Sequence, residues 1–212
     1  MEFEFVKPAD IEKRSFEIIT AELGERTFPP EIEPIVKRVI HTSADFDYAD
    51  HLAFSEGAVQ RAIAAIQNGA HIVTDTSMVQ AGINKKILAQ FGGAVHCFIA
   101  DEDVAAEAKR RGVTRSTVSM EHAAKLDVPL LFAIGNAPTA LIELARLVEA
   151  GKLKPELIVG VPVGFVNVVE SKELIMQSSA PYIVARGRKG GSNIAAAIVN
   201  ALLYQLVQRE GF

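Results

Sequence analysis

The sequence predicts an α/β protein built on a doubly wound, mainly parallel, five-stranded sheet with helices added at the N-terminus. Two observations predict this class. From residue 57 onward, short apolar segments alternate with helical ones, as strands and crossover helices do in a parallel sheet. Each short segment is apolar throughout rather than at every second position, which is typical of strands covered on both faces.

The chain has the size and composition of one such domain. Its 212 residues are 49% hydrophobic, which is enough to bury a full core. We therefore expect residues 1–212 to form a single domain, with helices over residues 1–56 and the alternating strands and helices over residues 57–212. The net charge of -4 argues against a nucleic acid or an anionic membrane as the main partner.

Before residue 57 the pattern is helical and contains no predicted strand. The segment 8–23 is predicted to be a helix with Pro8 near its start, since proline is favoured in the first turn. The segment 29–41 is predicted to be a second helix, which ends at His41. The stretch RVIHTSADFDY, from Arg38 to Tyr48, then places hydroxyl and carboxylate side chains directly after that histidine.

Five apolar segments are the predicted strands, and polar or turn residues follow them. In open parallel sheets, ligands bind beyond the carboxyl ends of the strands. Pairs such as Asp75-Thr76 and Gly135-Asn136 stand at those ends, so we expect a site along that edge. The predicted strands are 71–76, 94–99, 129–134, 156–161 and 181–186; the helices between and after them include 103–112, 137–151, 164–177 and 192–208.

The segment RGRKGGSN, from Arg186 to Asn193, is a candidate anion site. Three basic side chains precede Gly190 and Gly191 at the start of the last helix. Glycines let backbone N–H groups approach a ligand, and a helix N-terminus favours negative charge. The alternative is a solvated basic turn with an ordinary cap at Ser192 or Asn193. No Walker loop and no G-x-G-x-x-G follows a strand, which argues against a nucleotide.

His41 follows Arg38 at helical spacing, so the two side chains share a face if the helix extends that far. A histidine there can donate or accept a proton at neutral pH, and Arg38 can hold a ligand carboxylate beside it. A helix-end histidine hydrogen-bonded to its own last turn is the alternative. The carboxylates of Asp45, Asp47 and Asp50 lack the glycine and distal glutamate of a calcium loop and are interpreted as caps and turn formers.

The other polar candidates have structural interpretations. Cys97 lies in an apolar run and is interpreted as an inert core thiol, and the remaining histidines show no zinc-binding spacing. Arg115 lies in the stretch 114–126, which is interpreted either as a mobile lid over the strand ends or as a solvated loop with a capping Ser or Thr. A single cysteine, no signal-peptide pattern and no long apolar run predict a cytoplasmic protein without a membrane span.

Five stretches of the sequence, taken together, resemble the precorrin-8 methylmutase family of corrinoid (vitamin B12) biosynthesis, whose members are also called cobalt-precorrin-8 methylmutases. They are RVIHTSADFDY, TDTSMVQAGI, IGNAPTAL, GVPVGFVNVVESKE and ARGRKGGSNIAAAIVNAL, in the family's order from about residue 10 onward. The resemblance implies a homodimer of Rossmann-like α/β subunits with no cofactor and no metal. It also implies an isomerase that moves a methyl group from C-11 to C-12 of precorrin-8 or cobalt-precorrin-8, giving hydrogenobyrinate or cobyrinate.

The resemblance assigns His41 as the catalytic residue and places Ser15 and Arg38 at substrate contacts. We expect His41, as imidazolium, to protonate or hydrogen-bond the conjugated macrocycle near ring C. The substrate's acetates and propionates would pair with basic side chains and helix N-termini. The expected substrate-binding residues are Ser15, Arg38, Thr42, Arg115, Arg186, Lys189, Gly190 and Ser192.

Two other functions remain as alternatives. A corrinoid-holding module would bind its ligand tightly with negligible turnover. A nucleotide- or S-adenosylmethionine-dependent methyltransferase would bind one of those ligands, although the missing glycine fingerprint argues against it.

Overall fold

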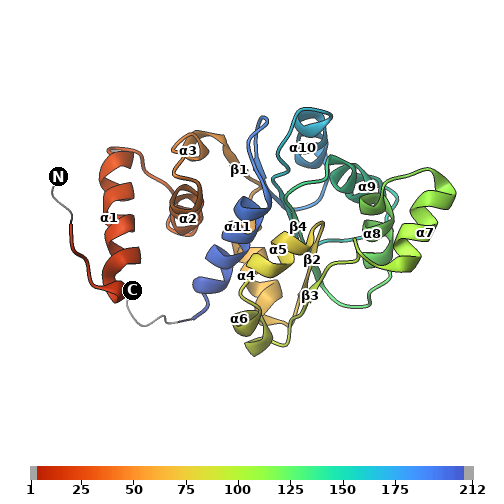
Figure 1. Cartoon of the computed structure of the whole chain (residues 1–212), viewed down its shortest axis with the longest axis horizontal. Helices are drawn as coiled ribbons and strands as arrows, with labels where there is room; N and C mark the ends of the chain where they lie inside the picture. Colours follow the sequence, from red (N-terminus) through yellow and green to blue (C-terminus); the bar gives the residue numbers. More distant parts are fainter. Residues whose placement is uncertain (1–3, 208–212) are drawn as a thin grey trace.

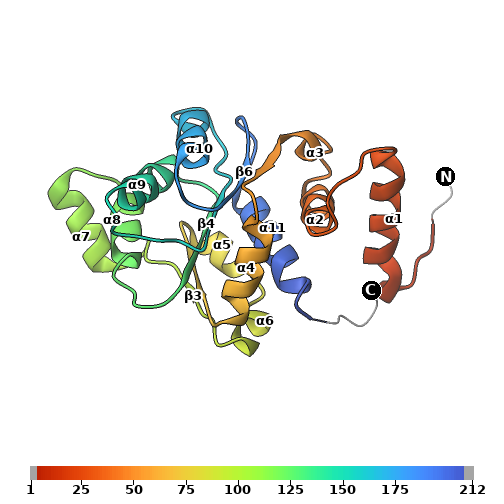
Figure 2. The same ribbon diagram turned by 180° about the vertical axis from the view of Figure 1, so that it is seen from behind.

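The computed structural model describes residues 4–207 and confirms the α/β class (Figures 1 and 2). One sheet of six strands has the order β1-β6-β5-β4-β2-β3. All neighbours are parallel except β1 and β6, which are antiparallel. The strands are β1 (Leu52–Phe54), β2 (His71–Thr74), β3 (Val95–His96), β4 (Leu130–Ile134), β5 (Leu157–Gly160) and β6 (Tyr182–Ala185).

The five predicted strands appear as β2 to β6, and the sixth, β1, was not predicted. The expectation that residues 1–56 contain helices only is therefore wrong at Leu52–Phe54. Three residues are too few to show a strand period, and β1 exists because its backbone pairs with β6. The predicted strand 94–99 shortens to Val95–His96 because the chain leaves the ladder after His96 and enters a turn.

The helices follow the predicted alternation, with additional short helices between them. Residue 208, the last of the predicted C-terminal helix, lies outside the described residues, as do the ends of the predicted domain, 1–3 and 209–212. The helices are η1 (Pro8–Asp10), α1 (Ile11–Leu23), α2 (Glu33–Ser43), α3 (Tyr48–His51), α4 (Ala58–Gln67), α5 (Ser77–Gly82), α6 (Lys85–Gln90), α7 (Glu102–Arg111), α8 (Arg115–Ala123), α9 (Pro138–Glu149), α10 (Val168–Gln177) and α11 (Ser192–Tyr204).

Helices cover both faces of the sheet, so alternate strand residues enter two different cores. Ile72, Leu131 and Val159 pack with α4, α5 and α11 on one face. Phe132 and Ile158 pack with α8, α9 and α10 on the other. In Figure 1, α1 and α7 lie at opposite ends of the long axis. Burial on both faces explains why these strands are continuously apolar in sequence.

The parallel strands have the order β3-β2-β4-β5-β6, so the chain leaves β2 in one direction for β3 and resumes on its other side with β4. This topological switch point lies between β2 and β4, where doubly wound sheets of this order bind ligands at the carboxyl ends. In the described part of the chain, no helix is long and apolar enough to cross a membrane.

Candidate functional site

His41 lies in the last turn of α2, which extends to Ser43. The helix therefore reaches His41, and Arg38 and His41 share one of its faces as predicted. Its imidazole stacks on the ring of Phe16 from α1, with 5.3 Å between ring centroids and an interplanar angle of 19°. Within residues 4–207 no hydrogen bond joins this ring to its own last turn. The simple helix-end interpretation is therefore wrong, and α1 orients the ring.

Arg38 lies one turn before His41 and is held from two sides. Its guanidinium forms an ion pair with Glu12 of α1. It also lies 4.8 Å from the ring centroid of Phe16 and 5.1 Å from that of Tyr204, at the end of α11. Cation–π contacts and a mostly buried ion pair restrict the side chain, so Arg38 is fixed beside His41 before any ligand binds.

The pKa of His41 is lowered from its ordinary value. Partial desolvation is the main cause, because it disfavours the imidazolium, and the nearby Arg38 charge lowers the pKa further. Glu12 acts in the opposite direction and raises it. The ring is therefore mostly neutral at neutral pH in the free protein, and anionic groups brought close to it would restore its ability to hold a proton.

Ser15 lies on α1 and Thr42 on α2. Ser15 is the neighbour of Phe16 on α1, and its hydroxyl donates to the carbonyl oxygen of Ile11 at 2.9 Å. Thr42 follows His41 and is exposed. The structure thus brings Arg38 and His41 of α2 together with Phe16 and Glu12 of α1, and Ser15 and Thr42 are the chain neighbours of this group.

Asp75 occupies the switch point between β2 and β4 and is almost completely buried. Its carboxylate accepts hydrogen bonds from the backbone N–H groups of Gly135, Asn136 and Ala137 at 2.9, 2.8 and 2.7 Å. Burial raises the pKa of the Asp75 carboxyl, and these three donors limit the rise. The buried acid thereby fixes the backbone between β4 and α9 along the carboxyl edge.

The loop between β6 and α11 packs its backbone against the end of β5. The N–H of Gly191 donates to the carbonyl oxygen of Val161 at 2.8 Å. Gly190 has φ +158°, and a Cβ on it would lie 2.1 Å from that same oxygen, so only glycine fits here. Ser192 begins α11 and its hydroxyl lies 3.1 Å from that of Thr76. The ordinary cap is therefore not observed, since Ser192 is the first helical residue and bonds across to Thr76, the N-cap residue of α5.

Lys172 is a fully buried residue of α10 that holds this loop from inside the protein. Its ammonium donates to the carbonyl oxygens of Gly187 at 2.8 Å and Lys189 at 2.9 Å. Desolvation lowers the pKa of Lys172 to about 8. The burial of Lys172 could not be predicted from the sequence, because a lysine in an amphipathic helix is usually solvated.

Lys189 connects the β6–α11 loop to the end of α2. Its ammonium lies 2.6 Å from a carboxylate oxygen of Asp45 and 2.6 Å from one of Asp47. Hydrogen bonding from Lys189 lowers the pKa of Asp45. Asp45 also accepts from the N–H of Asp47 at 3.0 Å, which confirms the turn-forming role. These ion pairs join the two groups of candidate residues that otherwise lie on different elements.

Arg115 begins α8, so the predicted lid or loop over residues 114–126 is wrong, although the predicted hydroxyl cap is confirmed. Thr114 caps this helix, since its side chain accepts from the N–H of Thr117 at 3.1 Å. A second bond joins the hydroxyls of Thr114 and Thr139, at the start of α9, at 2.9 Å. The hydroxyl residues thus start and pack a helix, and they place Arg115 near the carboxyl end of β4, outside contact with His41.

Arginines at the carboxyl edge differ from most others in their ion pairing. Among the described residues, Arg115, Arg186 and Arg188 have no carboxylate partner, and the only further arginine without one is Arg61 on α4. Unpaired guanidinium groups are available to bind ligand carboxylates in a bidentate way. The arginines that do form ion pairs are Arg14, Arg26, Arg38, Arg110, Arg111 and Arg146.

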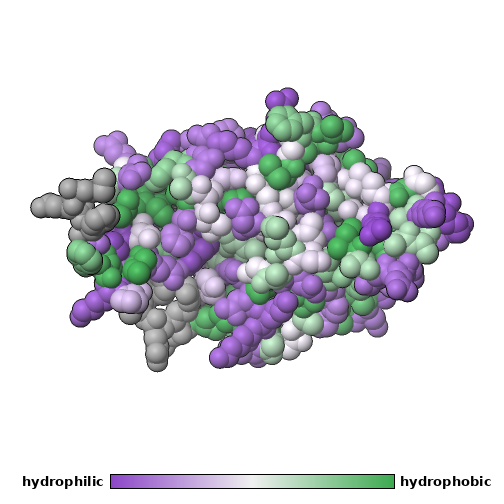
Figure 3. Space-filling model, viewed as in Figure 1, coloured by the Kyte–Doolittle hydropathy of each residue, from purple (hydrophilic) through white to green (hydrophobic). Residues whose placement is uncertain are grey.

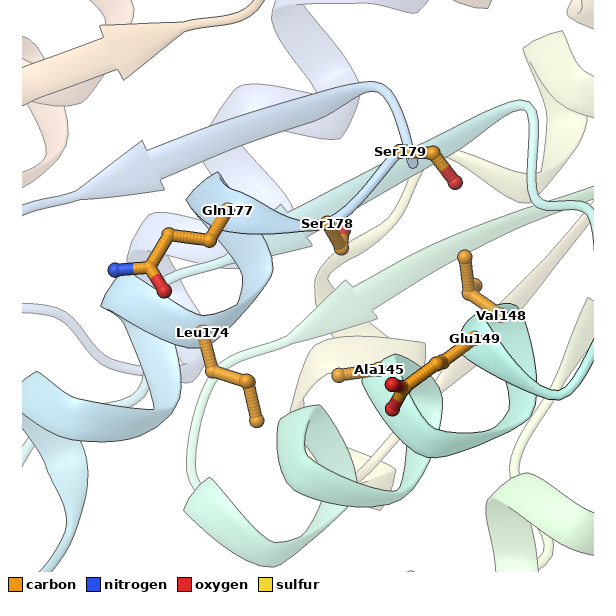
Figure 4. A pocket seen from close by; sticks show the side chains of 7 residues that line it. All are labelled: Ala145, Val148, Glu149, Leu174, Gln177, Ser178 and Ser179. Carbon is orange, nitrogen blue, oxygen red and sulfur yellow. The ribbon is translucent and has the colours of Figure 1, made fainter.

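A pocket of about 360 Å³ lies between the C-terminal ends of α9 and α10 (Figure 4). Because these helix ends precede β5 and β6, the pocket is at the edge where the strands begin, opposite the candidate residues. The pocket is lined by Ala145, Val148, Glu149, Leu174, Gln177, Ser178 and Ser179.

No metal-binding group is found in the described part of the chain. Among residues 4–207 no three histidine, cysteine, aspartate or glutamate side chains are grouped as metal ligands would be.

Comparison with known proteins identifies the family of this chain. The profile of the precorrin-8X methylmutase family matches residues 10–205. Cobalt-precorrin-8 methylmutases of Priestia megaterium and Salmonella typhimurium are each 48% identical, over 93% and 94% of this chain and 88% and 96% of theirs. The precorrin-8X methylmutase of Pseudomonas aeruginosa is 43% identical, over 91% of this chain and 93% of its own.

A solved structure agrees with the sequence comparisons. The crystal structure of precorrin-8x methyl mutase from Thermus thermophilus superposes with a TM-score of 0.84 at 39% identity, covering 92% of this chain and 96% of that one. Sequence similarity along most of the chain and a shared fold lead to one conclusion: the chain belongs to the precorrin-8X methylmutase family, whose members are isomerases of cobalamin biosynthesis.

Proposed function

We propose that this protein moves a methyl group from C-11 to C-12 of precorrin-8 or cobalt-precorrin-8, giving hydrogenobyrinate or cobyrinate. The observation that carries the proposal is the position of His41, stacked on Phe16 and one helical turn from the fixed guanidinium of Arg38. Relatives named for the cobalt-containing and the cobalt-free reaction are both similar to this chain, so the proposal covers both substrates.

The chemistry requires one proton and accurate positioning. The methyl group leaves C-11 and bonds to C-12 while the ring double bonds rearrange, so no electrons pass to or from the protein. His41 as imidazolium donates a proton or a hydrogen bond near ring C, which draws electron density toward that ring and lowers the barrier, and a donated proton returns to His41 once the methyl group has bonded to C-12. Substrate carboxylates near His41 raise its pKa again and thereby supply the charged form where it is needed.

The unpaired arginines give this substrate its second set of contacts. Arg115 and Arg186 lie at the carboxyl edge without carboxylate partners, and Ser192 and Gly190 place backbone and hydroxyl groups nearby. The peripheral acetates and propionates of a corrin precursor bind guanidinium groups and helix N-termini. Ser15 and Thr42 contribute hydroxyls around His41, and Lys189 exchanges its aspartate partners for a substrate carboxylate.

We also assign the protein to the cytoplasm as a homodimer. The lone free thiol of Cys97 suits a reducing compartment. A wide macrocycle also exceeds what either group of candidate residues covers alone, which favours a second copy near the site. Sedimentation velocity of the purified protein at micromolar concentration tests the dimer, and a single monomeric species would contradict it.

Visible absorption during reaction with precorrin-8 tests the proposed function. The wild-type protein should convert the spectrum to that of the product, and His41→Ala should bind the substrate but react about 10²–10⁴-fold more slowly. His122→Ala, a change at a histidine that stacks on Phe98 away from α2, is the control and should keep the wild-type rate. Equal rates in wild type and His41→Ala would refute the role of His41, and tight binding without turnover in wild type would identify a corrinoid-holding module instead.

A further inference from the structure

The loop between β5 and α10, residues 161–167, exposes apolar side chains at the carboxyl edge of the sheet. Phe165 is 83% exposed, Val166 77% and Val163 49%. Single exposed hydrophobic residues are common, but three within four positions form a contiguous strip, which usually marks a binding surface. In Figure 3, hydrophobic surface gathers over α10 and the segment that precedes it, at the top of the view.

This loop forms one unit with the loop between β6 and α11, and we call the two together the two-loop platform (residues 161–167 and 186–191). The N–H of Gly164 donates to the carbonyl oxygen of Arg188 at 3.2 Å, and the N–H of Gly191 donates to that of Val161 at 2.8 Å. The buried ammonium of Lys172 binds two further carbonyl oxygens of the platform. The apolar strip is therefore presented on a fixed base.

A cation lies directly beside the strip. The guanidinium of Arg188 is 5.4 Å from the ring centroid of Phe165, and no carboxylate of the described residues pairs with it. A guanidinium stacked on an aromatic face keeps its N–H donors free at the rim. The platform thus offers an apolar area bordered by an available cation, which complements a flat apolar ring system that carries carboxylates on its edge.

Continuity along the chain indicates which ligand covers the strip. Lys189, Gly190 and Ser192 follow Arg188 in the same loop and are already proposed to contact the substrate. A macrocycle that reaches these residues also lies within reach of the neighbouring strip. We infer that Phe165 and Arg188 are substrate-binding residues: Phe165 covers part of the corrin face and Arg188 pairs with a peripheral carboxylate. This inference rests on the proposed function and extends it to residues outside the expected set.

Titration with hydrogenobyrinate, followed by visible absorption, tests the inference. Phe165→Ser and Arg188→Gln should each raise the Kd about 10-fold or more, as expected for loss of an aromatic contact or a charge-assisted pair. The rate at saturating precorrin-8 should stay within about threefold, because contacts made equally with the substrate and with the transition state change KM more than kcat. Leu174→Ser removes a partly exposed apolar side chain from α10 at the opposite edge and should leave the Kd within about twofold.

A derivative of hydrogenobyrinate with its peripheral carboxylates converted to amides isolates the role of Arg188. Wild type and Arg188→Gln should bind this derivative with Kd values within about threefold of one another, because the charge pair is absent in both. Far-ultraviolet circular dichroism and a thermal melt confirm that each variant is folded.

Three outcomes contradict the inference. Unchanged Kd values for hydrogenobyrinate in both variants would overturn it. Conversion of a dimer to monomers by Phe165→Ser, with the Kd unchanged, would identify the strip as a contact between copies of the chain and would also overturn it. A wild-type protein that neither binds hydrogenobyrinate nor converts precorrin-8 would refute the proposed function itself, and the inference would fall with it.

Discussion

The α1–α2 helix pair and the two-loop platform hold their candidate groups in different ways. On the helix pair, side chains hold other side chains: Phe16 stacks on His41, and Glu12 pairs with Arg38. On the platform, the backbone itself is held, by close approach at Gly190 and by the ammonium of Lys172. The helix pair sets the pKa of His41. The contacts within the platform fix the conformation of its backbone.

This difference predicts which property each region controls. A change in the charges around His41 should mainly alter how the rate depends on pH, because the pKa of His41 responds to Arg38 and Glu12. A change within the platform should alter stability and ligand binding together, because buried backbone contacts cannot be moved without cost. The following substitutions test the distinction.

Gly190→Ala should have the largest effect. The new Cβ would overlap the carbonyl oxygen of Val161, so the loop must move, at a cost of about 2–4 kcal/mol in the free energy of unfolding. Urea denaturation measures this cost, and the Kd for hydrogenobyrinate should rise about 100-fold or more. Gly112→Ala is the control: that glycine also has positive φ, but no atom lies within 4 Å of the added Cβ, so we expect a loss of only about 1–2 kcal/mol. Equal losses in the two variants would show that the close approach at Val161 has no special role.

Lys172→Met should have an intermediate effect that depends on pH. The pKa of Lys172 in the folded protein, about 8, lies below its ordinary value of 10.5. Between these values the unfolded chain binds more protons than the folded one, so the stability of the wild type rises with pH in this window. Lys172→Met lacks this rise.

The measurement for Lys172 is the free energy of unfolding of both proteins at pH 7, 8, 9 and 10. The difference, wild type minus variant, should increase by on the order of 1 kcal/mol or more from pH 8 to pH 10. A difference that stays constant over this range would mean that Lys172 is not desolvated as the structure indicates. The Kd for hydrogenobyrinate should also rise, by about 10-fold, since the carbonyls of Gly187 and Lys189 lose their common donor.

Glu12→Gln should have the smallest effect, confined to the pH profile. Glu12 raises the pKa of His41, while burial and Arg38 lower it, so removal of this carboxylate lowers the pKa further. If His41 acts as an acid, kcat/KM should begin to fall at a lower pH than in wild type, and the rate at pH 7 should drop about two- to fivefold.

A matched control for this substitution lies on the same helix. Glu17→Gln removes an exposed carboxylate that pairs with Arg14 at 3.4 Å and should leave the pH profile unchanged. An identical profile for wild type and Glu12→Gln would argue that the protonation of His41 does not limit the reaction.

The sheet could be predicted from the sequence because its strands are buried on both faces. Burial makes β4 and β5 uniformly apolar, and this signal is local. The strand β1 escaped prediction because its three partly buried residues become a strand only through pairing with β6, more than 120 positions later in the chain. Similarly, a capping hydroxyl in the stretch around Arg115 could be predicted from the sequence, but the helix α8 that Thr114 caps could not, because the hydroxyl residues of this stretch also suit a loop.

The candidate site was predictable only in part, for the same physical reason. His41 and Arg38 share a helix face, which a spacing of three residues shows directly. The partners that set their properties, Glu12, Phe16 and Tyr204, come from other helices, and no sequence period connects them. Lys172 resembled an ordinary surface lysine, and its burial follows from tertiary packing alone.

The two edges of the sheet also determine how copies of this chain can associate. At one edge β1 has three residues, and at the other β3 has two. Such short strands offer too few free N–H and C=O groups for another chain to add a strand, which protects the protein against edge-to-edge aggregation. The proposed homodimer would therefore be joined by helices and loops, and its sheets would remain separate.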